Sequence, residues 1–154
     1  MSKPVKFGLL VGAIGLVTNA CISALLGLCG PGVSLIAGAV VGYLIGHQAV
    51  GKAQAGKDGA LGGAVAGVLL LVGQIIGGLL ALVIIQHVPS QGGWLQPPSP
   101  SAPGSEIALY YMGGLGAGVC FGLIDIAIAA LGGTLVARWT AQEEAPPPPP
   151  PVLE

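Results

Sequence analysis

The chain has 154 residues, of which 53% are hydrophobic and only 7% are charged, and its mean hydropathy is +0.87. Five basic and six acidic side chains cannot cover the surface of a soluble protein of this size, because soluble domains carry about 25% charged residues. The composition therefore excludes an ordinary soluble globular domain. The net charge of −1 and the absence of a basic cluster argue against nucleic acid as a partner.

The first two predicted membrane spans lie on either side of a short turn. Residues 7–28 form an apolar run with no charged side chain, and the sequence Cys29-Gly30-Pro31-Gly32 then interrupts the helix. A span of the hydrocarbon core requires about 20 mainly apolar residues. The second predicted span, residues 32–50, reaches that length only if it includes His47 and Gln48.

A polar segment from residue 51 to residue 59 separates these spans from the third, which is predicted over residues 60–86. The fourth span is predicted over residues 107–137 and is long enough to tilt in the bilayer. Helices are expected throughout, because a backbone in hydrocarbon must satisfy its own hydrogen bonds and these runs lack the alternation of barrel strands. The sequence thus predicts an all-α integral membrane protein with four transmembrane helices in two hairpins.

The basic residues predict the orientation of the four spans. Lys3 and Lys6 precede the first span, Lys52 and Lys57 lie between the second and the third, and Arg138 follows the fourth. With four spans these positions share one side, which the positive-inside tendency makes cytoplasmic. Both chain ends are therefore expected in the cytoplasm of a bacterial or archaeal cell, with a multi-pass domain over residues 1–140.

Two proline-rich segments lie outside the predicted spans. Residues 88–106 form the outer loop, which is expected to be an extended linker or, through Trp94, a contact with the membrane interface or a partner. The tail, residues 141–154, is expected to be disordered, or to present Pro146–Pro151 to a cytosolic partner with an aromatic groove. The N-terminus has an alternative interpretation as a signal peptide cleaved before Cys21, although the apolar run continues beyond that point.

Glycines four residues apart occur in every predicted span. Residues at this spacing share a helix face, and a face without side chains lets another backbone approach closely. The predicted helix-packing glycines are Gly8, Gly12, Gly38, Gly42, Gly46, Gly63, Gly67, Gly73, Gly77, Gly114, Gly118 and Gly122. They indicate a closely packed helical domain and favour association with further membrane helices.

Three polar residues lie deep within the predicted spans: Asn19, Gln74 and Asp125. A buried carboxylate is costly in a bilayer, so Asp125 is expected to face protein or water. If the depths of the three residues agree, Asn19, Gln74 and a protonated Asp125 form one hydrogen-bonded cluster. Structural bonding between helices, a proton or ion site, and a subunit contact all remain open for Asp125.

Enzyme motifs and metal-binding spacings are not found in the sequence. Neither His47 nor His87 has a second ligand at a useful spacing, and the three cysteines match no zinc or haem motif. The run Gly114–Gly118 has the spacing of a nucleotide-binding loop but lies inside a span rather than after a strand. We expect no catalytic residue, no metal and no cofactor.

Two resemblances to known families follow from these features. The four-span layout with one carboxylate in the fourth helix is similar to that of rotary-ATPase proteolipids, a resemblance that implies an ion-carrying role for Asp125. The long loop before that helix departs from the family's plan. The segments AGAVVGYLIG and GALGGAVAG, within residues 8–80, resemble small four-helix prokaryotic membrane proteins of unknown function, which implies a fold and no functional residues.

The function expected from the sequence is non-enzymatic. The chain is predicted to be a packing or accessory subunit, or a homo-oligomer, with the bilayer and other membrane subunits as its partners. The alternative is a small proton or ion transporter or channel that uses Asp125.

Overall fold

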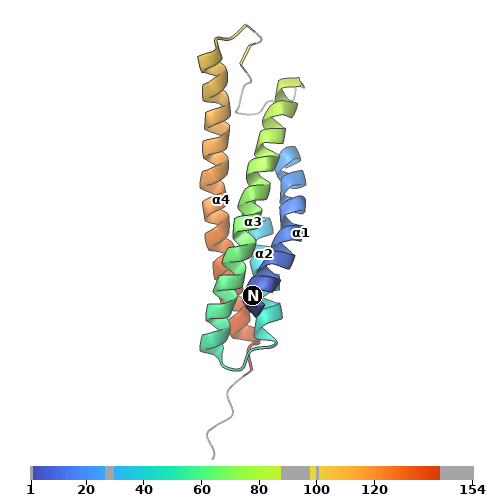
Figure 1. The fold of residues 1–154 in the computed structure, drawn as a ribbon, viewed down its shortest axis with the longest axis vertical. Coiled ribbons are helices and arrows are strands. Elements are labelled where there is room, and N and C mark those ends of the chain that lie inside the picture. The colour runs from blue at the N-terminus through green and yellow to red at the C-terminus, as the bar shows by residue number, and fades with distance from the viewer. Residues whose placement is uncertain (1, 27–29, 88–97, 100, 143–154) are drawn as a thin grey trace, which may run out of the picture.

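The computed structural model of the protein describes residues 2–26, 30–87, 98–99 and 101–142. These residues form four α-helices: α1 (Lys3–Leu26), α2 (Gly30–Gly46), α3 (Lys52–His87) and α4 (Gly104–Thr140). The helices lie side by side along one long axis (Figure 1), and no β-strand occurs in the described part of the chain. The prediction of an all-helical protein is confirmed.

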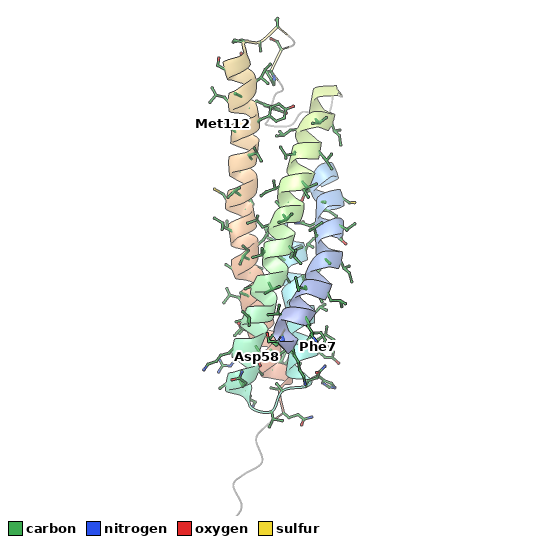
Figure 2. The ribbon with its side chains drawn as sticks, in the orientation of Figure 1. Phe7, Asp58 and Met112 are labelled. Carbon is green, nitrogen blue, oxygen red and sulfur yellow. The ribbon has the colours of Figure 1, made fainter. Side chains whose placement is uncertain are left out.

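Three helices, α1, α3 and α4, are long and apolar enough to cross a membrane, and the shorter α2 is apolar over Pro31–Gly46. Their outward faces carry large apolar side chains: Ile14, Leu131 and Leu135 are each more than 60% exposed. A water-soluble protein places such residues inside, so this surface is compatible with a multi-pass membrane protein surrounded by hydrocarbon. Figure 2 shows side chains projecting outward from the helices along their length.

The N-terminus, the start of α3 and the end of α4 lie at the same end of the molecule, the lower end in Figure 1. All five basic residues belong to these segments, and all five are exposed. We call this the basic end. The opposite end carries the first turns of α4, in which Glu106 is the acidic residue.

Small residues form the closest contacts between the helices. Helices α2 and α4 run in the same direction, with Gly38 against Ala129 and Gly42 against Gly133. Helices α1 and α3 also run in one direction, with Gly8 against the backbone of Gly62. Helix α3 packs against all three other helices, whereas the backbones of α1 and α4 nowhere come within 8 Å of each other in the described residues. Helices α2 and α3 therefore separate α1 from α4.

Large apolar side chains are few in the interior. One cluster combines Val41, Ile45 and Ala66, with Phe7 and Val11 packed against it. A second lies at the basic end, and consists of Ala55, Ala137 and Ala141 together with Ala49. Because alanine and glycine occupy most inward positions, the helix backbones approach each other closely.

The boundary between α2 and α3 differs from the prediction. Helix α2 ends at Gly46 rather than continuing to Val50, and α3 begins at Lys52 within the segment predicted to be a polar loop. Gly51 has a φ of 94°, a left-handed conformation that glycine adopts without strain, and it turns the chain between the two helices. The extra turns of α3 are helical because their small residues, such as Gly59 against Gly133, pack on the end of α4.

The outer loop and the tail lie largely outside the described residues. Helix α4 includes residues 104–106, which the sequence assigned to the loop. Of the tail, Ala141 and Gln142 are described: the Gln142 carbonyl accepts a 3.2 Å hydrogen bond from the Gly51 amide, and Val50 forms an isolated bridge with Gln142. Trp94 and Pro146–Pro151 fall outside the described residues.

Candidate functional site

Five polar side chains are buried within the helices. Asn19 and Ser23 come from α1, Ser34 from α2, Gln74 from α3 and Asp125 from α4, and each is at most 4% exposed. We call these five residues the polar layer. Every helix contributes to it, although the surrounding sequence of each helix is almost entirely apolar. Such residues inside a membrane helix usually contact protein rather than lipid.

Three members of the polar layer are joined by hydrogen bonds between α1 and α3. The Asn19 side-chain amide donates to the Leu70 carbonyl at 3.0 Å and to Gln74 Oε1 at 3.2 Å. The Ser23 hydroxyl donates to the same Gln74 oxygen at 2.8 Å. These bonds fix the register of α1 on α3, because a shift of either helix by one turn would separate all of the donors from their acceptors.

Asp125 lies in the interior but does not join that network. Its side chain is fully buried, and neither carboxyl oxygen has a hydrogen-bond partner among the described residues. Ser34 is the neighbouring polar side chain. Gly38 of α2 packs on Ala129 of α4, and Ser34 and Asp125 each lie one helical turn before these two residues. The carboxyl group thus faces α2 and α3 from α4.

Asn19 and Asp125 lie at a common depth. Asn19 bonds to the carbonyl of Leu70. The residues on either side of Asp125, Gly122 and Ile126, contact the turns of α3 that flank Leu70. The Asn19 Oδ1 atom, like the Asp125 oxygens, is buried and has no hydrogen-bond partner in the described part of the chain.

The cluster expected from the sequence is therefore formed in part. Asn19 and Gln74 are brought together, whereas Asp125 lies at their depth without a hydrogen bond to either. Ser23 completes the network, and Thr18 instead points outward and bonds to the Ile14 carbonyl. Sequence reasoning missed Ser34, which the spacing could have revealed because it lies four residues before Gly38 on the same face.

Eleven of the twelve glycines predicted to pack have a neighbouring helix within contact distance. A side chain at Gly73 would meet the backbone of Leu16 at 2.6 Å, and one at Gly77 would meet the backbone of Ala20 at 2.6 Å. The others with close neighbours are Gly8, Gly12, Gly38, Gly42, Gly46, Gly63, Gly67, Gly114 and Gly122. Gly59, Gly62 and Gly133 make similar contacts and were not predicted. Gly59 precedes Gly63 by four residues but was assigned to the polar segment, and Gly62 and Gly133 have no glycine four residues away.

Gly118 is the exception. No described atom lies within 4 Å of the position where its Cβ would be, and the same holds for Gly113 and Gly116. Gly118 lines a small pocket between α3 and α4, together with Gln74, Ile75, Gly78, Leu79, Gly114 and Leu115. Gly78, on the α3 side of this pocket, also lacks a neighbour. The pocket remains open because Gly78 and Gly118 have no side chains to fill it. On either side of the pocket, Leu82 packs on Gly114 and Leu71 packs on Gly122.

Gly113 and Gly116 lie on another face of α4. Gly116 and Cys120 follow Gly113 by three and seven residues, so the three residues share one face of the helix. Cys120 is an exposed free thiol. We call Gly113, Gly116 and Cys120 the open face of α4. Helix α2 begins near the depth of Asp125, so residues 104–120 of α4 pack only against α3 among the described helices.

The other residues with metal-binding or aromatic chemistry lie apart from the polar layer. His47 is exposed and stacks on Tyr43 with ring centroids 5.5 Å apart. No group of three potential metal-ligating side chains occurs among the described residues. Trp139 is 87% exposed at the basic end, where its ring can lie at a membrane surface.

The buried site offers hydrogen-bond acceptors and one carboxyl group, and it contains no nucleophile with an adjacent base. Buried groups of this kind can bind a proton or a cation, or hold helices together. Comparisons with protein-family models, with curated proteins and with solved structures gave no match for this chain.

Proposed function

We propose that this chain is a four-pass membrane protein that associates with another membrane helix through the open face of α4, either in a second copy or in a larger complex. Both chain ends lie on the cytoplasmic side in this proposal, since the basic end contains every lysine and arginine. No catalytic role is assigned. Helix α2, of 17 residues, is at the lower limit of the length that spans the hydrocarbon core.

The open face is the observation that carries the proposal. Many glycines in the middle of a helix are covered by a neighbouring helix, as Gly42 is by the backbone of Gly133, and the uncovered Gly78 and Gly118 both line the small pocket between α3 and α4. Gly113 and Gly116 have the same small size and no neighbour. Glycine inside a helix costs about 1 kcal/mol relative to alanine. In membrane proteins a close backbone approach is what small residues provide, so uncovered glycines favour a partner helix at this place.

The native cysteine of the open face allows a direct test. A variant with Cys21→Ser and Cys29→Ser retains Cys120 as its single thiol, and oxidation in the membrane would link two copies whose open faces meet. We expect a covalent dimer, and we expect Gly116→Leu to abolish it by holding the helices apart. As a control, Val17→Ala changes an exposed residue of α1, on a helix that does not carry the open face, and should leave the dimer yield unchanged.

The partner's identity decides between the two forms of the proposal. If Cys120 gives no dimer, a bifunctional lipid-soluble crosslinker in native membranes should link the chain to a larger subunit through the same thiol. A chain that stays monomeric in both experiments, with or without Gly116→Leu, would contradict association through this face.

Proton or ion transport is the second candidate, and the unpartnered carboxyl of Asp125 is the observation that favours it. Purified protein in vesicles should then carry protons or a monovalent cation, and Asp125→Asn should abolish the flux. Asp58→Asn, which changes a carboxylate near the basic end, is the control. Transport fails as a function if vesicles with and without protein have equal flux.

A further inference from the structure

The Asp125 carboxyl group has no positively charged side chain beside it among the described residues. It is fully buried, and both of its oxygens lack a hydrogen-bond donor within the described ranges. The Asn19 Oδ1 atom, at the same depth, also lacks a donor. The polar layer therefore contains three buried oxygen atoms without a hydrogen bond of good geometry, and the Ser34 hydroxyl is the polar neighbour of the Asp125 carboxyl.

Among the side chains that the structure describes, none of the basic ones comes near this depth. Arg138 follows Asp125 by thirteen residues on α4, which is about 20 Å along a helix. On the other helices, Lys6 precedes Asn19 by thirteen residues and His47 follows Ser34 by thirteen. The lysines of α3 lie in its first two turns, at the basic end. The groups that face the carboxyl from the packed helices are thus neutral: Ser34 on α2 and the residues around Leu70 on α3.

A carboxylate is strongly disfavoured in such an interior, because burial removes its hydration and the single hydroxyl of Ser34 does not replace it. We infer that the Asp125 carboxyl, beside Ser34, is a binding site for one positive charge, supplied by a proton or by a small monovalent cation. A proton on Asp125 turns one acceptor into a donor, which can bond to a neighbouring oxygen. A cation such as Na⁺ would take the carboxylate and hydroxyl oxygens as ligands.

The directions of the side chains bring the Asp125 and Asn19 side chains to similar depths along the bundle. Side chains on a helix lean toward its N-terminus. Since α4 descends toward the basic end and α1 ascends from it, Asp125 leans toward the depth of Asn19 and Asn19 leans toward the depth of Asp125. The site depends neither on association through the open face nor on transport, because a bound charge can simply stay in place.

The composition of the chain permits a direct measurement, since Asp58 and Asp125 are its only aspartates. Full-length protein labelled with ¹³C only at the aspartate side-chain carboxyl would give two resonances in magnetic-resonance spectra. Asp58→Asn removes one of them and identifies the other as Asp125. Asp58 lies at the exposed basic end, where Gln54 donates a 3.1 Å hydrogen bond to it, and serves as the internal reference.

The expected spectra distinguish the two sources of charge. With a proton, Asp125 shows the resonance of a protonated acid near neutral pH. With a cation, Asp125 is ionised, and its resonance shifts when choline chloride is exchanged for sodium chloride while that of Asp58 does not. An Asp125 resonance that is ionised near neutral pH and unmoved by Na⁺, Li⁺ or K⁺ would overturn the inference. Because the wild-type chain carries the result, no substitution at Asp125 has to fold.

Discussion

Substitution of Gly42 by alanine tests whether the glycine contacts between α2 and α4 stabilise the protein. An ideal Cβ at this position would lie 2.5 Å from the Gly133 carbonyl oxygen, 3.0 Å from the Gly133 Cα atom and 3.1 Å from the Ala137 amide nitrogen. All three neighbours are backbone atoms, which cannot rotate away as a flexible side chain can. The added methyl group must therefore push α2 away from α4.

Gly116→Ala is the matched control, because it makes the same chemical change in the middle of a helix where no described atom lies within 4 Å. Both substitutions gain the same helix propensity, about 1 kcal/mol. The difference between their free energies of unfolding therefore isolates the packing term. Overpacking in a close-packed interior costs about 1–3 kcal/mol. We expect Gly42→Ala to be less stable than Gly116→Ala by that amount, which is roughly a 5-fold to 150-fold change in the unfolding equilibrium.

The measurement is the free energy of unfolding in mixed micelles of a mild detergent and SDS, followed by circular dichroism. It should be repeated at two protein concentrations, so that any association through the open face does not contribute. If the two variants have the same stability within about 0.5 kcal/mol, or if Gly42→Ala is the more stable, the close approach of α2 and α4 at Gly133 is not a stabilising feature.

Three further predictions use the same protein. Gln74→Leu should lower the free energy of unfolding by about 1–2 kcal/mol, and Ser23→Ala should lower it by less than about 1 kcal/mol. Because Ser23 donates a hydrogen bond to Gln74, the double variant should lose less stability than the sum of the two single variants. Gly51→Ala should cost about 1–2 kcal/mol in the same micelle titration, since its φ of 94° strains a residue with a side chain; equal stability would argue against that turn. In a cysteine-free background, Lys52→Cys should react with a charged maleimide from the cytoplasmic side of the membrane, whereas a single native Cys120 should react poorly with it from either side. Rapid labelling of Cys120 by that reagent would show that its part of α4 is in water rather than in lipid.

Much of the site was predictable because depth in a membrane helix follows from counting residues. Asn19 and Gln74 are polar residues in the middle of apolar runs, and each must find a partner in the interior. Asn19 and Gln74 meet because α1 and α3 run in parallel and in close contact. Glycines on both helices, such as Gly12 and Gly73, allow that close contact. The lack of a hydrogen bond from Asp125 to this pair was not predictable, because α1 and α4 are separated by the two other helices.

The helix boundaries show a different limit. The segment from residue 51 to residue 59 is polar, and polarity predicted a loop. Lys52 and Lys57 are instead exposed side chains in the first turns of α3. The small residues Ala55 and Gly59 of the same turns pack against the last part of α4. This contact is tertiary, so hydropathy does not reveal it.

The sequence by itself determined that the protein is helical, that its helices are apolar on all sides, and that its basic residues fall in three segments that four spans bring to one end. Composition and residue spacing suffice for these properties, since they depend on the solvent around each helix and on the helical repeat. Only the tertiary structure decided which glycines are covered. Gly114 and Gly118 look alike in the sequence, but the first packs on Leu82 and the second faces Gly78 across an open space. The physical reason is that a glycine makes contact only where the opposing helix supplies atoms at its depth, and that depends on where α2 begins and on how α3 and α4 are aligned.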